Sequence, residues 1–114
     1  MIKMYGLKNC DTCRKAMKWL DGEGITYEFV DVRKDGITQT DIKGWAASVG
    51  VESLLNRRGT TWRSLSDADK TKGEGDEAIL LMAAHPALIK RPVFVKKTEV
   101  RVGFKDGEQT WLKS

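Results

Sequence analysis

The first 35 residues contain two short apolar runs on either side of a helical stripe. Residues 1–7 and 25–32 are rich in β-forming residues and each predict a short strand. Between them, four apolar positions with the spacing of one helix face predict an amphipathic helix: Cys13, Ala16, Met17 and Leu20. Strand, helix and strand in this order predict a βαβ unit with two parallel strands.

Helical periodicity then dominates the middle of the chain. Thr38 or Thr40 is expected to cap a helix that Gly50 ends. The apolar stripe of this helix comprises Ile42, Trp45, Ala46 and Val49.

The rest of the middle segment predicts shorter helical pieces. Short turns of helix are expected at 54–55 and 62–65, followed by a polar and exposed stretch at 70–75. Residues 76–85 predict one more helix, which Pro86 prevents from continuing. Its buried face is expected to comprise Ile79, Leu80, Met82 and Ala83.

The chain returns to β-structure near its end. Residues 93–95 and 100–102 predict an antiparallel hairpin, and 104–112 predicts a final helix capped by Asp106. The order βαβ, helices, ββα suits several α/β arrangements. Among these arrangements, a Cys-x-x-Cys motif at the start of the first helix predicts a thioredoxin-like fold. Residues 1–114 are then expected to form a single domain with a helical insertion at about 35–90.

Composition supports a globular domain. Of the 114 residues, 40% are hydrophobic and 32% are charged, which excludes a disordered chain. The longest apolar run, from Ala78 to Ala84, is far shorter than the roughly 18 to 20 residues of a membrane span. A net charge of +4 is too small and too scattered to predict nucleic-acid binding, but it suits a small anion site.

The two cysteines, Cys10 and Cys13, carry the candidate chemistry. Asn9 or Asp11 is expected to cap the first helix, which places Cys10 where unpaired N–H groups and the helix dipole stabilise a thiolate. Cys13 follows one turn later, within reach of a disulfide. Cys10 is therefore expected to attack and Cys13 to resolve the mixed disulfide. Arg14 adds positive charge nearby.

Other interpretations of these cysteines are weaker. A structural zinc site takes four ligands, whereas the chain offers two Cys and one His, so no metal is expected. Two incidental buried cysteines would not explain a Cys-x-x-Cys motif between a strand and a helix. The single histidine, His85, is expected to interact with the end of its helix rather than to catalyse.

Three arginines are candidate anion ligands. Arg57, Arg58 and Arg91 can each be a solvated surface charge or a forked clamp for a carboxylate or an oxyanion.

Several motifs resemble the arsenate reductase (ArsC)-like family, in its branch of YffB and Spx proteins, and the resemblance covers the chain nearly end to end. They are Tyr5-Gly6-x-x-x-Cys10-x-x-Cys13-Arg14, Arg57-Arg58-Gly59-Thr60-x-Trp62, His85-Pro86-x-Leu88-Ile89-Lys90-Arg91-Pro92-Val93 and Val102-Gly103-Phe104.

The resemblance implies a cis Pro92 that faces the cysteines. It also implies that Cys10 is the nucleophile and that Arg91 holds an oxyanion, together with Arg57 or Arg58. A further arginine of the arsenate reductases has no clean counterpart, since Phe104 stands in its place. This disfavours arsenate reduction. The resemblance to YffB-type proteins implies instead a thiol reductase that uses glutathione as co-substrate.

The expected function is therefore a cytoplasmic, glutathione-dependent thiol reductase without a bound cofactor. Arg14, Arg57, Arg58, Arg91 and Pro92 are the expected glutathione or substrate ligands. The alternatives are an arsenate reductase coupled to glutaredoxin and a redox-switched, Spx-like regulator that binds RNA polymerase. Neither a membrane nor direct nucleic-acid binding is expected.

Overall fold

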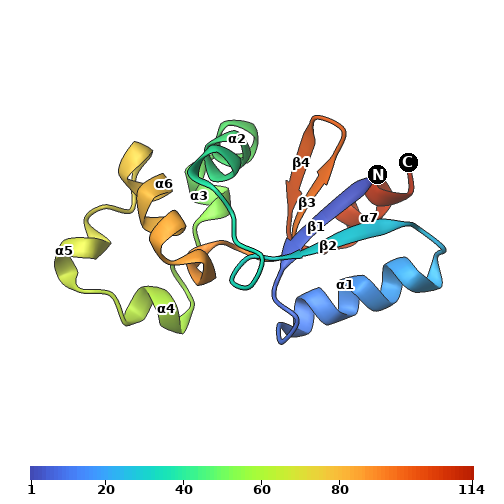
Figure 1. Ribbon diagram of the computed structural model, residues 1–114, viewed down its shortest axis with the longest axis horizontal. Helices are drawn as coiled ribbons and strands as arrows, with labels where there is room; N and C mark the ends of the chain where they lie inside the picture. Colours follow the sequence, from blue (N-terminus) through green and yellow to red (C-terminus); the bar gives the residue numbers. More distant parts are fainter. The chain divides into compact units, whose positions relative to one another are not determined.

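The computed structural model describes all residues from Met1 to Ser114 and divides them into two compact units. The first unit comprises Met1–Asp35 and Arg91–Ser114, and the second comprises Gly36–Lys90 (Figure 1). The second unit covers the range predicted as a helical insertion. No helix is long and apolar enough to cross a membrane.

The first unit begins with the predicted βαβ motif. Strand β1 (Ile2–Gly6) leads into helix α1 (Asp11–Gly22), and strand β2 (Tyr27–Asp31) follows. The two strands are parallel, and their register runs from Ile2 opposite Tyr27 to Gly6 opposite Asp31. The carboxyl ends of β1 and β2 therefore meet at one edge of the sheet, next to the start of α1 (Figure 1).

The C-terminal segment completes the sheet. Strands β3 (Val93–Lys96) and β4 (Glu99–Val102) form the predicted antiparallel hairpin, and β3 pairs with β1. The sheet order is β2-β1-β3-β4, with helix α7 (Asp106–Lys113) at the end of the chain. The prediction that Asp106 caps this helix is wrong. Asp106 is its first helical residue, and the N-cap is Lys105, whose N–H donates to Glu108 Oε1 at 3.0 Å.

The core of the first unit is built from α1, the sheet and α7. The apolar stripe of α1 is buried as its periodicity predicts, because Cys13, Ala16 and Leu20 have no exposed surface. They share one cluster of buried side chains with Ile2, Met4, Phe94, Trp111 and Leu112.

The second unit is helical. Its elements are α2 (Gln39–Val49), α3 (Val51–Leu54), α4 (Thr60–Arg63), α5 (Asp67–Lys70), α6 (Gly75–Ala84) and the 3-10 helix η1 (Pro86–Leu88). Thr38 caps α2 as expected: its hydroxyl accepts from Asp41 N–H at 3.1 Å, and the Asp41 carboxylate accepts from Thr38 N–H at 3.1 Å.

The predicted buried face of α6 is confirmed at Met82 but not at its other positions, since Ile79 and Ala83 are only partly buried. Leu80 is 52% exposed, and the side chains that pack inward are Ala78, Leu81 and Met82. Both stripes have helical spacing in this apolar helix, so periodicity did not distinguish them. Helix α5 was not predicted, because its polar sequence has no apolar stripe.

Gly6 allows close packing between β1 and α1. A Cβ added to Gly6 would lie 2.5 Å from Cys13 Sγ, so the sulfur occupies the place of a side chain. The missing Cβ thus lets α1 sit close against the strand that precedes Cys10.

Replacing Gly6 with alanine is expected to lower the free energy of unfolding by about 1–3 kcal/mol, because the new methyl group meets the Cys13 sulfur. The same change in a Cys13→Ala background should cost little. The remaining neighbours of the new Cβ, Cys13 Cβ at 3.6 Å and Phe29 Cε1 at 3.7 Å, are ordinary contacts. Urea denaturation of the four proteins measures this coupling.

Gly22→Ala is the matched control, since a Cβ at the end of α1 meets nothing within 4 Å. Its stability should equal or slightly exceed that of the wild type. Equal costs of Gly6→Ala with and without the Cys13 sulfur would contradict the proposed packing.

Candidate active site

Cys10 stands at the start of α1. It is the N-cap of the helix, with extended backbone angles of φ −92° and ψ 125° and a partly exposed side chain. Its N–H donates to Leu7 O at 3.2 Å, and its carbonyl accepts from Arg14 N–H at 2.9 Å. The prediction that Asn9 or Asp11 caps α1 is wrong, because no side chain fills that role. The first N–H groups of α1 therefore remain available to a charged sulfur at Cys10.

The surroundings of Cys10 favour its thiolate. Partial burial alone would raise its pKa, but three groups more than offset this effect. The Cys13 backbone N–H lowers the pKa of Cys10, and so does the Arg91 side chain, through a hydrogen bond and its positive charge. The Cys13 thiol adds a further hydrogen bond, and together these groups hold the pKa of Cys10 below its ordinary value. A lowered pKa and access to solvent are the two properties of a reactive cysteine.

Cys13 has the opposite character. Its side chain is fully buried, and this burial raises its pKa to about 12. The negative charge of a neighbouring Cys10 thiolate also contributes to this raised pKa, while the Leu7 backbone N–H and Arg91 act in the opposite direction. The two cysteines are free thiols in contact with each other. The surroundings of the two thiols thus differ: those of Cys10 favour the thiolate, and those of Cys13 favour the protonated form.

Arg91 and Pro92 connect the site to β3. The peptide bond between them is cis, as the resemblance implies. Pro92 is buried, and its carbonyl accepts from Gly103 N–H at 2.8 Å, which ties the start of β3 to the end of β4. Arg91 is partly buried, and its side chain reaches Cys10 from this position.

Arg14 lies close to Cys10 in the chain but is directed elsewhere. Its Nε donates to Lys8 O at 3.1 Å, and its Nη1 lies 4.0 Å from Asp11 Oδ1. It thereby secures the loop before Cys10. The use of Arg14 as a substrate ligand stays a prediction.

Arg57 and Arg58 lie in the second unit and differ from each other. Arg57 donates to Glu52 Oε2 at 2.7 Å and to Gly73 O at 2.5 Å, and it stacks 5.5 Å from the centre of the Trp62 ring. Through these contacts, the guanidinium of Arg57 joins separate segments of the helical unit. The Arg58 side chain is exposed and makes no hydrogen bond or ion pair. Anion binding by either residue stays a prediction.

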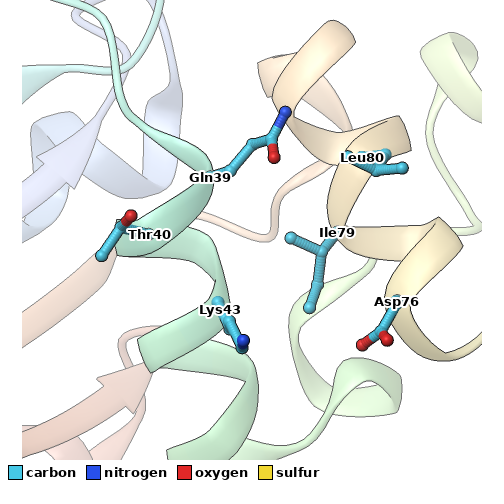
Figure 2. A pocket seen from close by; sticks show the side chains of 6 residues that line it. All are labelled: Gln39, Thr40, Lys43, Asp76, Ile79 and Leu80. Carbon is cyan, nitrogen blue, oxygen red and sulfur yellow. The ribbon is translucent and has the colours of Figure 1, made fainter.

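The second unit also has a depression of about 360 Å³ between α2 and α6 (Figure 2). Ile79 and Leu80 supply its apolar wall, with Lys43 and Asp76 towards one end. It contains no thiol, and no group of three His, Cys, Asp or Glu side chains anywhere gathers to hold a metal. The depression therefore lacks the nucleophile that makes Cys10 the candidate site.

Replacing Arg91 with methionine is expected to raise the pKa of Cys10, because the thiolate loses a charged hydrogen-bond donor. The rate of alkylation by iodoacetamide, followed from pH 5 to 10, reports this pKa, since buried Cys13 does not compete. Arg14→Gln is the control: it removes a nearby guanidinium that does not contact the sulfur, and it should leave the profile in place. An unchanged profile in Arg91→Met would exclude the Arg91 contribution.

Comparison with known proteins agrees with this architecture. A solved structure named YFFB protein is 40% identical, covers 100% of both chains and superposes with a TM-score of 0.91. An uncharacterised protein of Haemophilus influenzae is 37% identical over 108 residues, 95% of each chain. A Bacillus anthracis protein named global transcriptional regulator Spx 2 is 24% identical over 110 residues, 95% of this chain and 83% of its own.

The structural match confirms the predicted thioredoxin-like α/β fold class, and the relatives agree with the YffB and Spx branch of the resemblance. Such a fold is typical of thiol oxidoreductases. The model of the ArsC family matches residues 5–110, almost the whole chain, and the protein therefore belongs to the ArsC family.

Proposed function

We propose that this protein is a glutathione-dependent thiol–disulfide oxidoreductase with Cys10 as its nucleophile. The observation that carries the proposal is the opposite environment of two adjacent thiols. Arg91 and the start of α1 lower the pKa of Cys10 against the effect of burial, while burial raises the pKa of Cys13 to about 12. Only one of the two sulfurs is thus prepared to attack a substrate.

In the first step, the Cys10 thiolate attacks one sulfur of a disulfide substrate. A new S–S bond to Cys10 forms, the substrate bond breaks, and the released thiolate takes a proton from water. Arg91 orients and stabilises the attacking sulfur, and the helix N-terminus favours its negative charge.

In the second step, a glutathione thiolate attacks the mixed disulfide when Cys10 carries a glutathionyl group. Oxidised glutathione leaves and the Cys10 thiolate returns, so the substrate gains the two electrons that glutathione loses. Attack by Cys13 is the alternative route. It is slower because Cys13 must first lose a proton from a buried position.

Arginine side chains suit glutathione, which carries two carboxylates. We assign one carboxylate to Arg91, with Arg14, Arg57 and Arg58 as further candidates. The backbone beside Pro92 is the proposed partner of the peptide-like part of glutathione. Glutaredoxin is a further candidate partner, as a protein thiol that exchanges with Cys10.

Cys10→Ser is expected to lower glutathione-dependent reduction of a mixed disulfide by about three orders of magnitude or more, because the nucleophile is lost. Cys13→Ser should retain much of the activity, since glutathione can regenerate Cys10 directly. Turnover coupled to glutathione reductase and NADPH measures both variants, with melting temperatures as the check of folding.

Full activity of Cys10→Ser would remove the proposed mechanism. Loss of all activity in a folded Cys13→Ser variant would instead make the intramolecular disulfide an obligatory intermediate.

The second candidate function is a redox-switched regulator that binds RNA polymerase. It is favoured by the Bacillus anthracis relative, whose name is that of a transcriptional regulator and which matches 95% of this chain. Capture of purified polymerase by reduced protein, by oxidised protein and by Cys10→Ser distinguishes this role. Binding that changes with the redox state supports a regulator, and no binding in any state excludes it.

Arsenate reduction is tested separately. The absence of a clean counterpart for one arginine of the arsenate reductases predicts little glutathione consumption with arsenate and glutaredoxin. Arsenate-dependent oxidation of glutathione at a rate comparable with disulfide reduction would contradict this expectation.

A further inference from the structure

A basic depression lies at the sheet edge from which Cys10 emerges. It has a volume of about 350 Å³ and is lined by Leu7, Lys8, Asn9, Asp31, Arg33 and Lys34. Because β1 and β2 are parallel and Gly6 lies opposite Asp31, the segments that follow the two strands come together at this edge. The N–H of Val32 donates to Gly6 O at 3.0 Å and fixes that alignment. Ligands of parallel sheets bind outside the carboxyl ends of strands.

The depression has an excess of positive charge. Lys8, Arg33 and Lys34 are exposed, and none of them forms an ion pair within 4.0 Å. Asp31 supplies the one carboxylate among the lining residues. The Oδ1 of Asp31 accepts from the N–H groups of Arg33 and Lys34, both at 2.9 Å, so that oxygen shapes the turn that presents the two cations. The carboxylate of Asp35 belongs to the same turn, and its Oδ2 accepts from Asp31 N–H at 3.0 Å.

The depression is connected to the nucleophile through a short and fixed turn. Lys8 lies two residues before Cys10, and Leu7, which lines the depression, accepts the N–H of Cys10. Arg14 Nε holds Lys8 O at 3.1 Å from the first turn of α1. A ligand in the depression would therefore lie beside the turn that leads directly into Cys10.

We propose that Lys8, Arg33 and Lys34 form a subsite for a carboxylate of the small thiol or disulfide that reacts at Cys10. This inference rests on the proposed thiol–disulfide exchange and names the substrate class: a low-molecular-weight disulfide with negative charge near its sulfur. The volume of the depression matches part of a small molecule rather than a protein surface. The subsite acts by attraction and positioning and takes no part in bond making.

Two chromogenic disulfides test the subsite. Dithiobis(nitrobenzoate) carries two carboxylates, whereas dithiodipyridine is neutral, and each releases a coloured thiol when the Cys10 thiolate attacks. The triple variant Lys8→Gln, Arg33→Gln, Lys34→Gln should react with the dianionic reagent about tenfold more slowly. Its rate with the neutral reagent should stay unchanged, as measured by stopped flow in the first phase.

A matched triple variant removes three exposed lysines elsewhere in the first unit: Lys18→Gln, Lys97→Gln and Lys105→Gln. It should keep the wild-type ratio of the two rates, because it changes net charge equally but leaves the depression intact. Added NaCl should lower the dianion rate of the wild-type protein and barely affect that of the Lys8, Arg33, Lys34 variant. If the triple variant is poorly folded, the single variants Lys8→Gln and Lys34→Gln replace it. Each should lower the rate with the dianionic reagent by a smaller factor and leave the rate with the neutral reagent unchanged.

Equal slowing with both reagents, no slowing with either, or an equal loss in the matched variant would overturn the subsite. These stoichiometric reactions need only an accessible Cys10 thiolate. Failure of glutathione-dependent turnover therefore rejects the proposed function without deciding the subsite, and an unchanged rate ratio rejects the subsite without deciding the function.

Discussion

The lowered pKa of Cys10 depends on how α1 begins. The helix has no side-chain cap, so its first N–H groups and its dipole are available to stabilise a thiolate at the N-cap residue Cys10. Arg91 adds a charged hydrogen bond from the start of β3, a segment 81 residues later in the chain. Partial burial works against this charge, and these contributions together exceed it.

The difference between the two cysteines follows from the packing of α1 on β1. The Cys13 sulfur fills the place of the missing Gly6 side chain, so it is enclosed, whereas Cys10 at the end of the helix reaches solvent. One packing contact thus separates a reactive thiol from a protected one only three residues away. In the proposed mechanism, this separation determines which sulfur forms the first bond with a substrate.

The arginines that the sequence suggests as anion ligands make different contacts. Arg91 acts on the sulfur itself, and Arg14 holds the loop that leads to it. Arg57 uses its guanidinium to join Glu52, Gly73 and the Trp62 ring within the helical unit. Charge at neighbouring positions in the sequence therefore does not by itself identify an anion ligand.

Local patterns in the sequence determined the βαβ unit, the helical middle, the β-hairpin and the place of Cys10 at the start of the first helix, because alternation and helical spacing are local properties. Tertiary structure alone decided the features that depend on distant segments meeting. These are the contact of Arg91 with Cys10, the enclosure of Cys13 against Gly6, the exposed position of Leu80, and the cluster of cations beyond β1 and β2. A sequence records spacing along the chain, whereas burial and charge contacts depend on which surfaces pack together in space.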